Sequence, residues 1–392
     1  MKAIAITNRG IEDIASKEID SFIKTKSKTE ERVVVFSIKS FKELCTVCYK
    51  AQSVSRVLFL LNSFKAEQEL EKIQDNIKKA IEKNNLSVWL SKDNTFKVLC
   101  KRVGEHSFSG QDITSVVGEL IIDKVKQKKG YKQKTDMKNP DVLVYVFINN
   151  ERGYIGVDLA GFDLGKRDYK IFSYAPSIKA PVAYALLRLA NFNAGKTLLD
   201  PFSGGGVVAI EAALLARNKA VNYYRKDELQ FLKYKNLKID SDKLFLLLDR
   251  ETKKFTKTKI YCFNSQMRFL SAAKKNSKIA GVNKNITFGR VDVEWLDARL
   301  SEGGIDVIAS NAPRVSKNVK REFVEKLYKE LFYQAKYILK KDGRIVLLSN
   351  ETELMKEAAS KNDFKVVEER SVWQGKQELK VCVFEKSKSL SS

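Results

Sequence analysis

Histidine and cysteine are scarce in this chain of 392 residues, which has one histidine, His106, and five cysteines. Cys45 and Cys48 form a CxxC pair, but no second pair exists, and one histidine is too few to complete a typical four-ligand zinc site. We therefore expect no metal. The cysteines are predicted to be small buried hydrophobes in a reducing compartment.

Long apolar runs are also missing. No stretch approaches the roughly 20 residues that cross a bilayer, and acids follow the first residues too early for a signal peptide. We expect a cytoplasmic protein without membrane contact. Its length and its 44% hydrophobic residues predict two or three domains with sizeable cores.

Basic residues strongly outnumber acidic ones. There are 72 Lys and Arg against 48 Asp and Glu, a net charge of +24, of which +6 lies before residue 165 and +18 after it. Such an excess attracts a polyanion and releases its counterions, so nucleic acid is the expected partner. The alternative is a lysine-rich surface that is merely solvated.

One basic strip surrounds Tyr131. It could contact phosphates while the ring stacks on a base, although a solvated helix end explains it equally well. Its members are Lys124, Lys126, Lys128, Lys129, Lys132, Lys134 and Lys138.

The first half mixes strand and helix patterns, which predicts small α+β domains. Leu70, Ile73, Ile77 and Ile81 mark one helical face. Strands are predicted at 3–7, 32–38, from 96, 141–148 and 153–159, and helices at 11–23, 41–61, 70–86 and from about 112.

The second half alternates strands with helices, which is typical of a doubly wound parallel sheet. The pattern changes past Leu164, where we place a domain boundary. A Lys-rich stretch, 218–259, interrupts the alternation and is predicted to be a helical insertion. Strands are predicted at 197–199, 260–263, 286–291, 305–309, 345–348, near 366 and at 381–384.

Residues 198–211, LLDPFSGGGVVAIE, are the most informative run. A short strand ends in an acid, breaks into three glycines and continues as a helix. Glycines let a ligand lie close to the backbone, and the unpaired amides of a helix start favour an anion. A plain strand-turn-helix connection uses the same residues, so the run alone indicates a nucleotide pocket only weakly.

Four stretches together resemble the THUMP-containing RNA methyltransferases that modify guanine N2, especially the archaeal type acting on tRNA. Residues 96–121 resemble the THUMP signature, and 139–169 its closing strands and basic exit segment. Residues 173–190 resemble the helix that enters the catalytic domain, and 200–216 the first methyltransferase motif.

The resemblance implies three parts: a ferredoxin-like α+β domain at 1–60, a THUMP RNA-binding domain at 61–165, and a class I, Rossmann-like methyltransferase domain at 166–392. It also implies methyl transfer from S-adenosylmethionine to guanine N2 in structured RNA, most simply tRNA, whose acceptor end the THUMP domain would grip. The candidate RNA-binding residues are Lys101, Arg102, His106, Lys128, Lys129 and Lys132.

The same resemblance implies a cofactor site at the glycine turn. Asp292 matches the acid that receives the adenine amino group, although an Asp at a strand end can also be a simple cap. Ser177 and Lys179 match, more weakly, a loop that closes over cofactor or RNA. The residues matched to the cofactor cradle are Asp200, Pro201, Phe202, Ser203, Gly204, Gly205 and Gly206.

Two positions depart from the family pattern. Asn264 stands where an acid normally holds both ribose hydroxyls, a weakening of roughly 1 to 2 kcal/mol. The reactive loop reads Asn311, Ala312, Pro313, Arg314 in place of Asn-Pro-Pro-Tyr or Asp-Pro-Pro-Tyr.

This loop must solve a chemical problem, because an exocyclic amine is a poor nucleophile. Asn311 Oδ1 and a backbone carbonyl could accept the amine hydrogens and aim the nitrogen, while Pro313 fixes the acceptors. Ala312 should loosen the loop by about 0.4 to 1 kcal/mol. Arg314 could replace the stacking ring with its guanidinium plane.

The departures leave an alternative function open, a catalytically impaired or inactive RNA-binding protein derived from such an enzyme. A DNA amino-methyltransferase shares the chemistry but does not explain the THUMP-like half. Trp295 and Trp373 lie beside predicted strands and are expected to be core residues.

Overall fold

The computed structural model describes residues 1–83, 86–174, 177–253 and 258–387, and the chain divides into two compact units. The N-terminal unit comprises Met1–Thr7, Ala15–Leu164 and Arg225–Leu248. The C-terminal unit comprises Asn8–Ile14, Gly165–Tyr224 and Asp249–Ser392. The boundaries that we predict at 60 and 165 for three domains stay a prediction.

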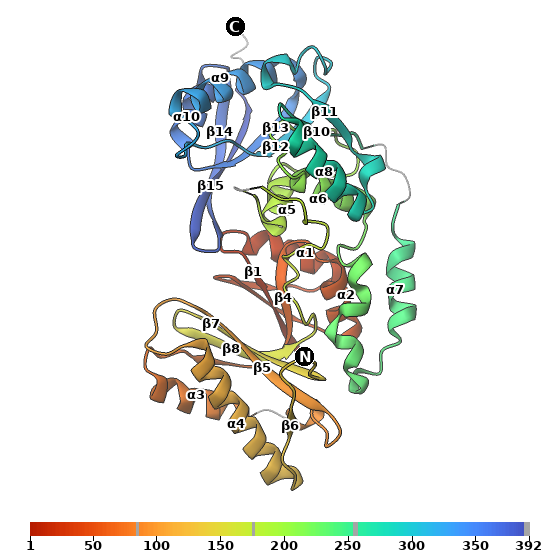
Figure 1. Cartoon of the computed structure of the whole chain (residues 1–392), viewed down its shortest axis with the longest axis vertical. Helices are drawn as coiled ribbons and strands as arrows, with labels where there is room; N and C mark the ends of the chain where they lie inside the picture. The colour runs from red at the N-terminus through yellow and green to blue at the C-terminus, as the bar shows by residue number, and fades with distance from the viewer. Residues whose placement is uncertain (84–85, 175–176, 254–257, 388–392) are drawn as a thin grey trace. The chain divides into compact units, whose positions relative to one another are not determined.

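The N-terminal unit is built on one eight-stranded sheet of order β2-β3-β1-β4-β8-β7-β5-β6. Helices α3 and α4 lie side by side against it (Figure 1). Its elements in chain order are β1 (Lys2–Thr7), α1 (Glu12–Ile23), β2 (Lys28–Glu30), β3 (Val33–Ser37), α2 (Phe41–Lys50), β4 (Val54–Lys65), α3 (Leu70–Glu82), η1 (Leu86–Val88), β5 (Thr95–Val103), α4 (Gly110–Lys129), β6 (Lys134–Thr135), β7 (Val142–Asn149) and β8 (Arg152–Asp158).

Local signals explain the longest helix of this unit. Ser109 and Asp112 form a capping box at the start of α4, which satisfies backbone amides that the first turn leaves unpaired. Gly130 ends the helix with φ of 74°, a left-handed conformation that glycine adopts without strain.

The prediction of one helix over 41–61 is wrong. Helix α2 ends at Lys50, and β4 begins at Val54. The Glu18 carboxylate accepts hydrogen bonds from the backbone amides of Gln52 and Ser53, which holds the chain in a turn between the two elements. The apolar run after Ser53 fits either period, and tertiary contacts decided for a strand.

The C-terminal unit contains a seven-stranded sheet of order β11-β10-β9-β12-β13-β15-β14, in which β15 pairs antiparallel with its neighbours. The α/β fold class is confirmed. The remaining elements are α5 (Ala180–Leu189), β9 (Leu198–Asp200), α6 (Val207–Arg217), η2 (Tyr223–Glu228), η3 (Gln230–Lys233), η4 (Lys235–Leu237), α7 (Ser241–Arg250), β10 (Ile260–Asn264), α8 (Met267–Ile279), η5 (Asn283–Asn285), β11 (Thr287–Arg290), η6 (Val293–Trp295), β12 (Ile305–Asn311), α9 (Arg321–Ile338), β13 (Leu339–Ser349), α10 (Thr352–Ser360), β14 (Phe364–Gln374) and β15 (Gln377–Lys386).

Two apolar cores cover the two faces of this sheet. Helices α5, α6 and α8 contribute to one core, and α9 and α10 to the other. Covered on both faces, the central strands are continuous apolar runs, as expected of a parallel sheet.

The helical insertion predicted at 218–259 is confirmed in part. It forms the three short helices η2, η3 and η4 before α7, and residues 254–257 lie outside the described chain. Its segment Arg225–Leu248 belongs to the N-terminal unit, where Phe245 packs on Tyr49 with ring centroids 4.8 Å apart.

Cys45 and Cys48 are fully buried, as predicted for small hydrophobes, and burial raises the pKa of both thiols. Among the described helices, none combines the length and apolar character needed to cross a membrane.

Candidate active site

The carboxyl ends of four neighbouring strands form one edge of the C-terminal sheet. Strand β9 lies between β10 and β12. From β9 the strand order continues through β10 to β11 on one side and through β12 to β13 on the other. Ligands of open α/β sheets bind at such a switch point. The predicted cofactor and catalytic residues Asp200, Asn264 and Asn311 end three of these strands, and Asp292 follows the fourth.

The glycine turn connects β9 to α6. Gly204 and Gly206 have φ of 48° and 80°, where a side chain is strained. A Cβ on Gly206 would lie 2.8 Å from Ala273 Cβ, whereas a Cβ on Gly204 would meet nothing within 4 Å. The space over Gly204 is therefore available to a ligand. Helix α6 then begins after Gly206, which has no side chain to cap the first-turn amides.

The other residues of the predicted cradle lie in the floor of this turn. Pro201 and Ser203 are buried, and Phe202 packs partly against one of the two cores. The Ser203 amide donates to the Phe263 carbonyl at 3.1 Å, which joins the turn to β10.

Asp200 is 1% exposed and turns inward. Its Oδ1 accepts a hydrogen bond from Ser310 Oγ at 2.6 Å, and burial raises the pKa of the carboxyl to about 7. Ser310 immediately precedes Asn311, so this bond joins the glycine turn to the reactive loop. The sequence did not single out Ser310.

Asn264 and Asp292 lie on the opposite side of β9 from the reactive loop. Asn264 Oδ1 accepts from the Gln266 amide at 2.9 Å, so its acceptor already serves its own turn. Asp292 is exposed and makes no side-chain cap hydrogen bond to η6. Asp292 therefore does not cap η6, and the alternative of a cap at the strand end stays a prediction.

The reactive loop is held by three contacts that its sequence did not reveal. The Ala312 amide donates to the Leu348 carbonyl at 3.0 Å, a bond that proline could not make. Tyr328 Oη donates to the Pro313 carbonyl, and Glu351 accepts from the Val315 amide at 3.0 Å. These contacts offset the greater flexibility of the loop that Ala312 predicts.

Arg314 points back over the loop. Its Nη2 lies 3.4 Å from Asn311 Oδ1, and within the part of the chain that the structure describes, Nε and Nη1 are buried without a hydrogen-bond partner. Desolvation lowers the pKa of the guanidinium, partly countered by Tyr328 and Glu351. A half-buried guanidinium with unused donors is a candidate to contact a ligand.

The segment that enters the C-terminal unit is anchored by a buried ion pair. Arg167 Nε lies 2.9 Å from Glu211 Oε1 on α6, and Tyr169 Oη donates to the same oxygen at 2.7 Å. Burial raises the pKa of Tyr169. The sequence indicated only a basic exit segment here, because nothing in it pairs Arg167 with a glutamate 44 residues away.

The predicted RNA-binding residues separate into two groups in the N-terminal unit. Lys101, Arg102 and His106 precede α4, whereas Lys128, Lys129 and Lys132 lie at its other end. Since α4 has 20 residues, the groups are about 30 Å apart. They do not form one patch.

His106 has a structural position within its group. Its Nε2 lies 3.0 Å from the Asn150 carbonyl, and Arg102 Nη1 lies 3.4 Å from its Nδ1. The imidazole therefore joins the β5–α4 connection to the β7–β8 turn.

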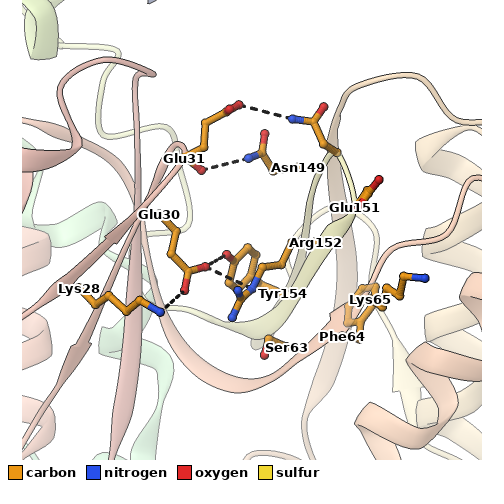
Figure 2. Close-up of a pocket in the computed structure, with 11 residues that line it drawn as sticks. Lys28, Glu30, Glu31, Ser63, Phe64, Lys65, Asn149, Glu151, Arg152 and Tyr154 are labelled. Carbon is orange, nitrogen blue, oxygen red and sulfur yellow. Dashed lines mark hydrogen bonds and ion pairs between the residues drawn. The ribbon is translucent and has the colours of Figure 1, made fainter.

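A pocket of about 690 Å³ also lies in the N-terminal unit, and the sequence did not predict it. Figure 2 shows Glu30 at its centre, where it accepts from Tyr154 Oη and pairs with Arg152 Nε at 3.2 Å and Lys28 Nζ at 3.7 Å. Glu30, Lys28 and Arg152 form a network inside the pocket, whereas Lys65 pairs with Glu67 at 2.8 Å and Glu31 with Arg32 at 3.8 Å, both outside its lining.

Trp295 corrects one expectation, since it is 63% exposed and not a core residue. It belongs to η6, three residues after Asp292 and close to the sheet edge. Ser177 and Lys179 precede α5, but Ala175 and Pro176 of the same loop lie outside the described residues.

The residues at the sheet edge fit S-adenosylmethionine. The open space over Gly204 and the amides at the start of α6 suit a ligand that approaches the backbone closely, and the exposed Asp292 carboxylate can accept hydrogen bonds. In the part of the chain that the structure describes, no group of three or more His, Cys, Asp and Glu side chains could hold a metal ion.

Two family models match the chain. The RMKL-like methyltransferase domain matches residues 167–380, and the THUMP domain matches residues 70–158. The tRNA (guanine(6)-N2)-methyltransferase of Methanocaldococcus jannaschii is 30% identical over 93% of this chain and 95% of its own length. The enzyme of the same name from Archaeoglobus fulgidus is 29% identical over 96% and 90%.

Solved structures share the fold over the whole chain. SMU.472, determined in complex with SAH, has a TM-score of 0.82 at 19% identity and covers 99% of this chain and 98% of its own. TrmN from Thermus thermophilus has a TM-score of 0.71 at 22% identity, with coverage of 98% and 99%. The chain belongs to the THUMP-containing RMKL-like methyltransferases, the family of the archaeal tRNA (guanine-N2)-methyltransferases.

Proposed function

We propose that this protein methylates N2 of guanine 6 in tRNA, using S-adenosylmethionine. The observation that carries the proposal is the bond between Ser310 and Asp200, which holds the reactive loop beside the glycine turn at the sheet edge. The names of the two archaeal relatives support the substrate and its position.

The residues of the cofactor site have distinct proposed roles. When bound, S-adenosylmethionine supplies an activated methyl group. The amides at the start of α6 and the open backbone at Gly204 receive it, Asp200 braces the turn, and Asp292 accepts the adenine amino group. Asn264 offers the ribose one amide in place of a carboxylate.

Asn311 and the loop around it act on the guanine. Asn311 Oδ1 accepts one hydrogen of the exocyclic amine, and the Ala312 carbonyl accepts the other, because the Pro313 carbonyl already accepts from Tyr328. This alignment aims the nitrogen at the methyl group, and the amine's proton leaves to water or to a backbone acceptor after transfer. Arg314 gives up its contact with Asn311 and contacts the base, either by stacking its guanidinium plane or by donating hydrogen bonds.

The THUMP-bearing N-terminal unit is proposed to hold the acceptor stem. Lys128, Lys129 and Lys132 are exposed at the end of α4, where they can meet phosphates, although Lys129 Nζ also donates to the Leu90 carbonyl at 2.8 Å. The cytoplasmic location expected from the sequence remains a prediction.

The test is methyl incorporation from labelled cofactor into an unmodified tRNA transcript, followed by nucleoside analysis. We expect N2-methylguanosine at position 6 only. A tRNA with inosine at position 6 lacks the exocyclic amine and keeps the rest of the base, so it should bind and stay unlabelled. Label elsewhere would refute the target position.

The second candidate function is an RNA-binding protein without activity, which Asn264 and the Asn-Ala-Pro-Arg loop favour. Tight tRNA binding by a folded protein that incorporates no label would select it.

A further inference from the structure

Exposed rings and cations gather on α8 and on the segment that enters the C-terminal unit. Phe172 and Tyr174 are 38% and 43% exposed. Tyr174 meets Phe269 edge to face with centroids 5.0 Å apart, Arg268 lies 4.8 Å above the Phe269 ring, and Lys275 Nζ lies 4.8 Å above the Phe172 ring. We call these five residues the α8 platform.

The platform belongs to a helix with charge of one sign. Helix α8 carries Arg268, Lys274, Lys275 and Lys278 and no Asp or Glu. Within residues 1–83, 86–174, 177–253 and 258–387, none of these four cations forms an ion pair. Their field is therefore available to an anionic partner.

Asn276 fixes the platform against the cofactor edge. This fully buried residue of α8 donates from Nδ2 to the Phe172 carbonyl at 2.8 Å and to the Gly205 carbonyl at 2.9 Å. Its Oδ1 accepts from the Phe172 amide at 3.0 Å. The Asn276 side chain thus connects the glycine turn to the segment that contains Phe172. This connection fixes the platform beside the turn.

We propose that the α8 platform binds the RNA strand flanking the target nucleotide. Rings that interleave with unpaired cations suit a single strand, because bases stack on the rings while phosphates meet the cations. A double helix hides its base faces, so the fit is to RNA opened around the extruded guanine. This inference rests on the proposed function, since it names the surface by which the same site holds its substrate.

The experiment compares tRNA affinity and cofactor affinity in matched variants. Phe172→Ala combined with Tyr174→Ala removes two rings, and Lys275→Ala removes one cation. Tyr333→Ala is the control, because Tyr333 is a 64% exposed ring on α9 of the same unit. Binding of an unmodified tRNA transcript is measured over a salt series, and binding of S-adenosylhomocysteine by calorimetry.

We expect the double variant to weaken tRNA binding at least about 10-fold, since each stacked base contributes measurably. Lys275→Ala should lower the salt slope of log affinity by about 1. Cofactor binding should stay within twofold of wild type in both variants, and Tyr333→Ala should change neither affinity. A 4-thiouridine placed beside the target should crosslink to the platform.

Two results overturn the proposal. If the double variant loses S-adenosylhomocysteine binding and keeps tRNA affinity, the rings belong to a cofactor lid. If its tRNA affinity matches that of Tyr333→Ala, the platform serves another partner, such as a protein. A wild type that binds tRNA through the platform but transfers no methyl group would refute the proposed function alone.

Discussion

The two loops at the active edge are held in different ways. The glycine turn is shaped by its own backbone, with left-handed glycines and a close approach of Gly206 to Ala273. The reactive loop is shaped by its neighbours, through Leu348, Tyr328 and Glu351. A backbone-determined loop must keep its sequence to keep its form. A neighbour-held loop can exchange residues, which explains how Ala312 and Arg314 are accommodated.

The largest effect is expected where the reactive loop meets the substrate. Asn311→Ala removes the side-chain acceptor for the amine, and we expect kcat to fall by about 10² to 10³-fold, as when one preorganised transition-state contact is lost. Single-turnover methyl transfer measures this. tRNA affinity should stay within twofold, and unchanged turnover would show that the loop is assigned wrongly.

The glycine turn should respond differently at its two left-handed positions. Gly206→Ala combines an unfavourable φ with a clash against Ala273 and should lower the free energy of unfolding by about 2 to 3 kcal/mol. Gly204→Ala should cost only about 1 kcal/mol, because its Cβ meets no atom, yet abolish cofactor binding. Equal destabilisation in urea unfolding would contradict this.

The burial of Asp200 beneath the two loops should make stability depend on pH, while its bond from Ser310 limits the effect. The carboxyl of Asp200 has a pKa of about 7 in the folded chain, against 3.8 ordinarily, so the folded state binds more protons between these values. The free energy of unfolding should therefore fall as pH rises from about 4 to 7, by at most about 1.4 kcal/mol per pH unit from this group.

Two variants check that assignment. Asp200→Asn cannot ionise and should flatten the pH dependence of the unfolding midpoint over this range. Ser310→Ala removes a donor that lowers the pKa of Asp200, and should extend the loss of stability to higher pH. A profile unchanged in both would show that another group titrates.

The substitution at the predicted ribose contact, Asn264 in place of an acid, can be reversed. Asn264→Asp restores a carboxylate with an acceptor beyond the one that serves Gln266. We expect tighter S-adenosylmethionine binding by about 1 to 2 kcal/mol, roughly 5- to 30-fold. Calorimetry measures it, and weaker binding would place the ribose elsewhere.

The smallest effect tests how the reactive loop is held. Ala312→Pro restores the family's residue but loses the bond to the Leu348 carbonyl. An unpaired acceptor costs about 1 to 3 kcal/mol and the proline returns about 0.4 to 1, so we expect a net loss near 1 kcal/mol. A raised melting temperature would show that proline's rigidity matters more.

Short-range sequence patterns were enough to predict much of the fold. The contacts that we did not predict from the sequence join residues far apart in the chain. The strands at 260–263 and 305–309 and the glycine turn follow from local periodicity and turn chemistry, and all three are confirmed. Only the tertiary fold brings Ser310 to Asp200 and Asn276 to Phe172, since these partners are 110 and 104 residues apart. The helix predicted over 41–61 failed because an apolar run has no unique period.

Each unit is made of separate stretches of the chain, and this limits where the protein can be cut into stable fragments. A fragment beginning at residue 166 would lack Asn8, whose Nδ2 donates to the Trp373 carbonyl at 2.8 Å. It would also carry the insertion without Tyr49, exposing Phe245 to water. Neither unit is one continuous stretch, so a stable excised catalytic fragment would need the Asn8–Ile14 segment added and Arg225–Leu248 replaced by a linker. Gene fusion or shuffling at residue 165 would separate both units from parts of their own cores.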